Sequence, residues 1–218
     1  MSLKHSVVAA LFALSLVLAV SAQESGGVIG WFNGNWRSGI PGAWNWYVAP
    51  DNFARVYDQF RVPEGGWTVV SVFSDNVLLE FPSVIYASWE IRRGMAPGNG
   101  GEVVAAGVTP ATQDPDPSVT TPKYPAGEVK KHFRIQVDNL HVQLSAGRCW
   151  LSVTPVGKGD AYASATLGAN AIGIDQNGLA MALVDSPNSA RFAIAGSAAG
   201  AGQLGIAQHF AQGVIVAK

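Results

Sequence analysis

The central part of the chain alternates between apolar and polar residues with a period of two. In residues 85–92, one face carries the apolar side chains of Ile85, Ala87, Trp89 and Ile91. In residues 131–137, the expected inward-facing residues are Phe133, Ile135 and Val137, and the expected wet face carries Lys130, Lys131, His132, Arg134 and Gln136. Such alternation predicts β-strands with one buried face and one face in water.

Shorter stretches with the composition of strands follow the same rhythm. They are residues 54–60, 67–73, 77–81, 103–108, 140–144, 149–154, 179–184, 191–195 and 213–217. Turn residues separate many of them, for example at 63–66, 97–101, 145–147 and 175–178. No capped stretch of helical period reaches three turns after residue 22. The pattern therefore predicts an all-β protein, an antiparallel β-sandwich of jelly-roll type with about ten short strands.

The N-terminus departs from this pattern. Residues 1–22 have a short basic start, an apolar run over residues 7–20, and small residues at Val20-Ser21-Ala22. This is the pattern of a secretory signal peptide, although an uncleaved anchor is the alternative. We expect a secreted protein, extracellular or periplasmic, with no transmembrane span after cleavage. The expected organisation is a signal peptide at 1–22, a Trp-, Gly- and Asn-rich segment at 23–52, and a β-sandwich domain at 53–218.

Charge narrows the set of partners. The chain carries 14 basic and 15 acidic residues, and 13% of its residues are charged, about half of the roughly 25% that is usual. Because the net charge is −1, nucleic acid is not an expected partner. Much of the charge deficit falls after residue 160, in an Ala- and Gly-rich tail. We expect that tail to form strands, whose edges are an alternative route to self-association.

The chain has one cysteine, Cys149, so an intramolecular disulfide is excluded. Its place in an apolar stretch predicts a small residue of a half-buried strand. A disulfide between two chains is the alternative.

Four of the seven tryptophans lie within residues 30–47. Flat indole faces beside amide and guanidinium groups are suited to stacking on sugar rings and hydrogen-bonding to their hydroxyls. The candidate ligand-binding residues are Asn35, Trp36, Arg37, Trp44, Asn45, Trp46 and Tyr47. The alternative is that these aromatic residues fill the core. We assign Trp67, Trp89 and Trp150 to the core because they lie in alternating strands.

Patterns for catalysis and metal binding are weak. Asp114 and Asp116 could offer oxygen ligands, and a structural calcium ion held by scattered carboxylates is a further option, but the twelve-residue calcium loop is absent. His132, His141 and His209 form no zinc motif. No Gly-x-Ser-x-Gly motif of a serine hydrolase occurs. Glycoside hydrolysis needs two carboxylates in one cleft, but the sequence does not indicate which two would meet there among Asp58, Asp75, Glu80, Glu90 and Glu102. We therefore expect no enzymatic activity and no cofactor.

Three segments of the sequence resemble segments of a known protein family. They are "ASWEIRRGMAPGNGG" (87–101), "LSAGRCWLSVTPVGKG" (144–159) and "GANAIG" (168–173). Together with residues 53–76, they resemble a family of uncharacterised secreted bacterial β-sandwich proteins. The second run is also similar to a hairpin of jelly-roll and prepeptidase-like domains. The resemblance implies export and an all-β fold and lends no catalytic residue. The chain departs from the family at Cys149, where relatives often have tyrosine, and in lacking a sorting tail at 214–218.

Taken together, the patterns predict a non-catalytic module that binds an extracellular or cell-wall glycan. A structural, self-assembling surface component is the first alternative, and a polysaccharide-active hydrolase is the second.

Overall fold

The structure is a computed structural model that describes residues 26–36, 42–50, 52–79, 83–116, 131–173, 181–185, 191–194 and 209–218. These residues form strands and no helix, which confirms the predicted all-β fold. No helix in this part of the chain could cross a membrane. The predicted signal peptide at 1–22 lies outside the described residues.

The first sheet has eight strands built around β5 (Trp67–Leu79). Along one side of β5 lie β17 (Gln212–Val216) and β12 (Asp160–Ala163), and along the other lie β9 (Lys131–Val137) and β10 (Val142–Leu144). The outer strands are β1 (Val28–Phe32) on β17, β2 (Ala43–Trp44) on β12, and β8 (Thr112–Pro115) on β9.

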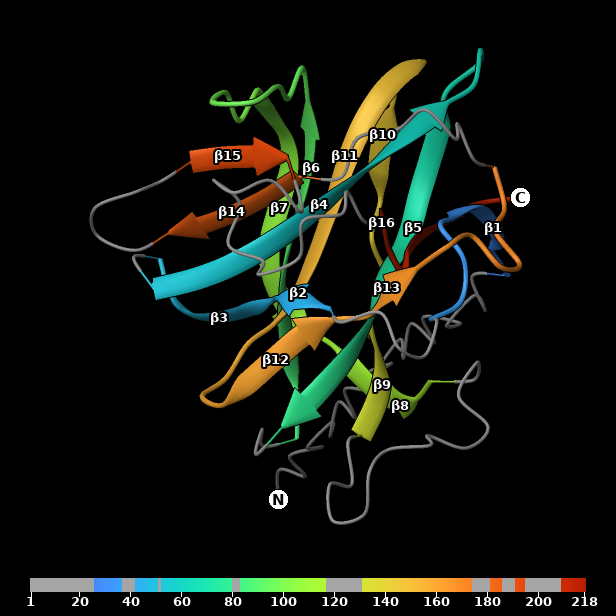
Figure 1. Ribbon diagram of the computed structural model, residues 1–218. Coiled ribbons are helices and arrows are strands. Elements are labelled where there is room, and N and C mark those ends of the chain that lie inside the picture. The colour runs from blue at the N-terminus through green and yellow to red at the C-terminus, as the bar shows by residue number, and fades with distance from the viewer. Residues whose placement is uncertain are drawn as a thin grey trace, which may run out of the picture.

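The second sheet has seven strands built around β4 (Asn52–Val62), which pairs with β3 (Trp46–Ala49), β11 (Gly147–Pro155) and β14 (Met181–Asp185). β15 (Arg191–Ile194) pairs with β14, and β6 (Tyr86–Arg93) joins β11 to β7 (Glu102–Pro110). A ribbon of β13 (Ala165–Thr166) and β16 (His209–Phe210) adds a third, two-stranded sheet. The paired strands within each sheet are antiparallel, and Figure 1 shows β4 and β5 as the long strands that cross the molecule.

The core lies between the two sheets. Trp31 of the first sheet stacks on Phe60 of the second at 5.2 Å between ring centroids, and Phe60 stacks on Trp67 of the first at 6.1 Å. Trp31 and Phe60 are fully buried. Each such ring contributes roughly 1.5–3 kcal/mol through burial, so this stack is a principal contact between the sheets.

The strand count is higher than predicted, because eight and seven strands form the two sheets where about ten were expected. The additional strands are short and lie in stretches rich in Gly, Asn or Pro. The segment 23–52 supplies β1, β2 and β3, and β8 lies after residue 108, where no strand was predicted. Strands of two to five residues span too few residues for a period-two pattern to be detected. The jelly-roll topology stays a prediction.

Two predicted faces need correction. Ala87, Trp89 and Ile91 are buried as expected, but Ile85 precedes β6 and is 65% exposed. On β9, Ile135 and Val137 are fully buried, whereas His132 is also buried instead of facing water. The Trp36 ring covers the outer face of β9 there, with 4.2 Å between the ring centroids of Trp36 and His132.

Candidate functional site

A surface pocket of about 370 Å³ lies where the chain crosses from the first sheet to the second. We call it the seam pocket. Its lining residues are Trp44, Trp46, Val48, Asn52, Lys158, Gly159, Asp160, Ala161 and Tyr162. They come from β2, β3, the start of β4, and β12 with the turn before it, which lie together at the lower left of Figure 1. The volume falls at the small end of the roughly 300–1,000 Å³ typical of small-molecule sites.

The two tryptophans of the seam pocket belong to different sheets. Trp44 pairs with Tyr162 at the edge of the first sheet, and Trp46 pairs with Ala54 at the edge of the second. Trp44 is 50% exposed, whereas Trp46 is half-buried and packs in part against the core. The pocket therefore offers one well exposed indole and one that is anchored in the core.

Asn45, between these tryptophans, is fully buried, so the prediction that it contacts a ligand is wrong. Its Nδ2 donates to Asn76 Oδ1 at 2.8 Å and to the Val153 carbonyl at 2.9 Å, and its Oδ1 accepts from Thr154 Oγ1 at 3.0 Å. Asn76 lies in the first sheet and Val153 in the second. Asn45 thus fixes the crossing of the chain between the sheets, and through it the positions of both indoles.

Tyr47 lies on the opposite face of β3 from Trp46 and does not line the seam pocket. Its ring stacks on Phe53 at 5.9 Å, and the Arg55 guanidinium lies 5.3 Å from its centroid. Side chains alternate between faces along a strand, so Trp46 and Tyr47 cannot both face the same ligand. The prediction placed them together because it did not resolve where this strand begins.

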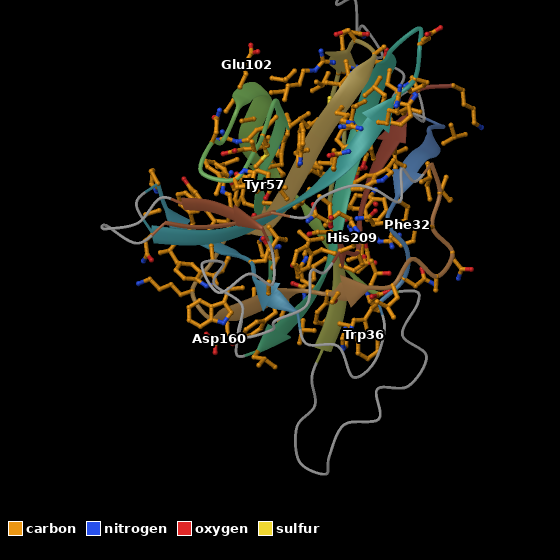
Figure 2. All side chains as sticks on the ribbon, turned by 45° about the horizontal axis from the view of Figure 1, so that its top comes forward. Phe32, Trp36, Tyr57, Glu102, Asp160 and His209 are labelled. Carbon is orange, nitrogen blue, oxygen red and sulfur yellow. The ribbon has the colours of Figure 1, made fainter. Side chains whose placement is uncertain are left out.

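Trp36 and Asn35 lie in a different region. Trp36 forms a bridge to Thr166 and packs on His132, and the Asn35 carbonyl accepts a hydrogen bond from Thr166 Oγ1 at 2.6 Å. Figure 2 shows Trp36 well separated from Asp160, which marks the seam pocket. The structure therefore divides the predicted surface in two, and Arg37 lies outside the described residues.

The polar groups of the seam pocket were not identified from the sequence. They are the side chains of Asn52, Lys158, Asp160 and Tyr162. Burial and the Asp160 carboxylate raise the pKa of Tyr162, and a hydrogen bond with Trp44 lowers it in part. The only signal for them was an acidic residue and a tyrosine two positions apart in a stretch otherwise rich in alanine and glycine.

Two of the acidic candidates are buried carboxylates that are paired with basic side chains. Asp58 is fully buried and lies 3.0 Å from His209 Nδ1, while its other oxygen accepts from the Phe210 amide at 2.6 Å. Asp75 is fully buried and accepts two bonds from Arg134, at 2.8 and 3.0 Å. Neither carboxylate lines the seam pocket. Both pairs tie strands together, β16 to β4 and β9 to β5.

The remaining acidic candidates do not converge on one site. Glu90 is paired with Arg55 and Arg92 on the second sheet, and Glu102 is exposed at the start of β7. Glu80 lies outside the described residues. No cluster of three His, Cys, Asp or Glu side chains that could hold a metal occurs in the described part of the chain. Of the two weak metal candidates, Asp114 is exposed and Asp116 is buried.

Cys149 is a buried, free thiol in the core, and burial raises its pKa. A disulfide to a second chain would require this strand to leave the sheet, so the burial disfavours that alternative. In the tail, β17 lies between β1 and β5 and presents no edge. The turn prediction at 175–178 falls outside the described residues.

In comparisons with known proteins, no family model, no curated protein and no solved structure matches the chain.

Proposed function

We propose that the protein is a secreted, non-catalytic module that binds an extracellular or cell-wall glycan in the seam pocket. The observation that carries the proposal is the half-exposed Trp44 ring beside Trp46 and Tyr162 in one pocket. Aromatic faces stack on the apolar face of a sugar ring, and nearby polar groups hydrogen-bond to its hydroxyls. Asn52, Lys158 and Asp160 supply such groups at the same place.

The proposal narrows the ligand surface predicted from the sequence. Trp44 and Trp46 stay in it, whereas Asn45 acts as the buried residue that positions them. Tyr162 takes the role assigned to Tyr47, since it pairs with Trp44 across the strands. Pre-organised rings lose little conformational freedom when a ligand binds, which favours affinity at a small site.

Affinity electrophoresis in gels that contain soluble polysaccharides tests the proposal. We expect retarded migration with at least one neutral or charged glycan, and loss of that retardation in Trp44→Ala and in Tyr162→Ala. Tyr86→Ala is the matched control, because Tyr86 is 45% exposed on β6 and does not line the seam pocket. Trp46→Ala is expected to act in the same direction, but it also removes packing against the core.

Two results would overturn the proposal. One is unchanged migration of the wild-type protein across a broad panel of glycans. The other is retardation that survives in folded Trp44→Ala and Tyr162→Ala, which would place any glycan site elsewhere on the molecule. Near-ultraviolet circular dichroism checks that each variant keeps its native packing.

A further inference from the structure

The two charged side chains of the seam pocket, Asp160 and Lys158, differ in their conformational freedom. Asp160 opens β12 and lies two residues before Tyr162, so the two side chains share one face of the strand. Trp44 pairs directly with Tyr162 on the neighbouring strand and shares that face. A carboxylate therefore stands beside two aromatic rings. The effect of the Asp160 charge on the Tyr162 hydroxyl is consistent with this closeness.

Lys158 lines the same pocket from a different kind of position. It lies in the turn that leads into β12, at residues 157–159; both Lys158 and Asp160 are exposed, so the two differ in backbone setting and side-chain length. A lysine side chain on a turn loses much rotamer freedom when it is fixed against a ligand, whereas a short aspartate on a strand loses little. The charge that is pre-organised towards a ligand is thus the negative one.

Aromatic rings and a carboxylate favour the same type of ligand charge. The faces of tryptophan and tyrosine attract cations through their ring quadrupoles, and a nearby carboxylate adds direct attraction. The exposed Trp44 ring and the Asp160 carboxylate line one pocket of about 370 Å³. A neutral sugar would gain nothing from this charge attraction, and an acidic sugar would be repelled by the Asp160 carboxylate.

We propose that the seam pocket prefers glycans that carry protonated amino groups, and that Asp160 is the residue that sets this preference. The inference rests on the proposed function, because it concerns the ligand of the same pocket. The ammonium group would lie between the carboxylate of Asp160 and the rings of Trp44 and Tyr162. The sugar ring that bears it would stack on the exposed indole.

The test compares two probes of equal length, a β-1,4-linked glucosamine oligosaccharide and its fully N-acetylated counterpart, in mildly acidic buffer at low salt. Acetylation removes the charge and keeps the sugar ring. We expect the wild-type protein to bind the cationic probe about tenfold more tightly by calorimetry. Asp160→Asn should bring the two affinities close together, chiefly by weakening binding of the cationic probe, because the amide keeps a hydrogen-bonding group and loses the charge. Lys158→Ala, the matched charge-removing control, should leave or increase the preference.

The outcomes separate this inference from the proposed function. Equal affinities of the wild-type protein for the two probes, or a preference that persists in Asp160→Asn, would overturn the inference and leave glycan binding intact. If the protein binds neither probe but another glycan retards its migration, the inference is also overturned and glycan binding stays intact. If no glycan binds at all, both proposals are overturned. A preference that disappears in Asp160→Asn and persists in Lys158→Ala would support the inference.

Discussion

Replacing Asn45 with alanine should destabilise the fold far more than its place beside the exposed Trp44 suggests. The amide makes three hydrogen bonds, to Asn76, Val153 and Thr154, at 2.8–3.0 Å. Each bond contributes about 1 kcal/mol net, and a buried partner left without one costs somewhat more. Asn76 Oδ1 loses its donor, whereas Asn76 Nδ2 keeps its bonds to Ser74 and holds the side chain in place. We expect Asn45→Ala to lower the free energy of unfolding by roughly 3–4 kcal/mol.

Urea unfolding followed by tryptophan fluorescence measures this loss. The midpoint should fall while the slope stays constant, because the variant unfolds the same surface. For a domain of this size, the midpoint of thermal unfolding should fall by about 6–15 °C. Asn52→Ala is the matched control: the same substitution at an exposed position of the pocket should change stability by at most about 0.5 kcal/mol.

The reasoning also predicts a functional result. Asn45 holds the chain where it passes from Trp44 to Trp46, so a folded Asn45→Ala variant should bind glycan more weakly although its side chain touches no ligand. A variant whose stability is within 0.5 kcal/mol of the wild-type protein would refute the assignment of Asn45 as the link between the sheets. So would a loss no larger than that of Asn52→Ala.

Two further predictions concern the pairs that the buried carboxylates of Asp58 and Asp75 form with His209 and Arg134. A hydrogen bond with Asp58 raises the pKa of His209 above its ordinary 6.5, so the stability that this pair contributes is complete below about pH 6.5 and is lost as pH rises through the raised pKa. The difference in unfolding free energy between the wild-type protein and His209→Gln should therefore shrink with rising pH, and a difference independent of pH would contradict it. Removing the guanidinium in Arg134→Leu should cost about 3–5 kcal/mol at neutral pH, because it leaves the Asp75 carboxylate buried without its partner. Burial raises the pKa of Asp75 from 3.8 to about 6 although Arg134 lowers it, so loss of Arg134 raises this pKa further. The cost should therefore be largest at high pH and fall as pH drops towards 6, because Asp75 becomes neutral in the variant first; equal costs at pH 8 and pH 5 would refute this account.

The sequence predicted the fold class because the long strands alternate cleanly. β6 and β9 each bury one apolar face, as with Trp89 and Ile91 on the former and Ile135 and Val137 on the latter. The sequence did not predict that the opposite faces are covered too. His132 and Arg134 were expected in water, yet Trp36 and Asp75 approach them from distant parts of the chain. A period-two pattern describes one strand and carries no information about what packs on its polar face.

The candidate site was predicted in part for the same reason. Trp44 and Trp46 were identified because tryptophan is conspicuous, but the residue between them was assigned the wrong role. An asparagine suits a surface and a buried network equally well, and only the partners from β5 and β11 distinguish the two. Asp160 and Tyr162 enter the pocket through strand pairing between residues more than a hundred positions apart, which no local pattern encodes.

The position of β17 has a consequence for how the molecule folds. This strand, last in chain order, lies between β1 and β5, so β1 has no place in the first sheet until residues 212–216 have been made. Before then, one side of β5 lacks its partner over residues 69–74, and β1 has only the isolated bridge between Phe32 and Ile172. Such long-range pairing slows folding and leaves apolar strand edges open to other chains. Folding of the first sheet is therefore completed only after residues 212–216 have been synthesised.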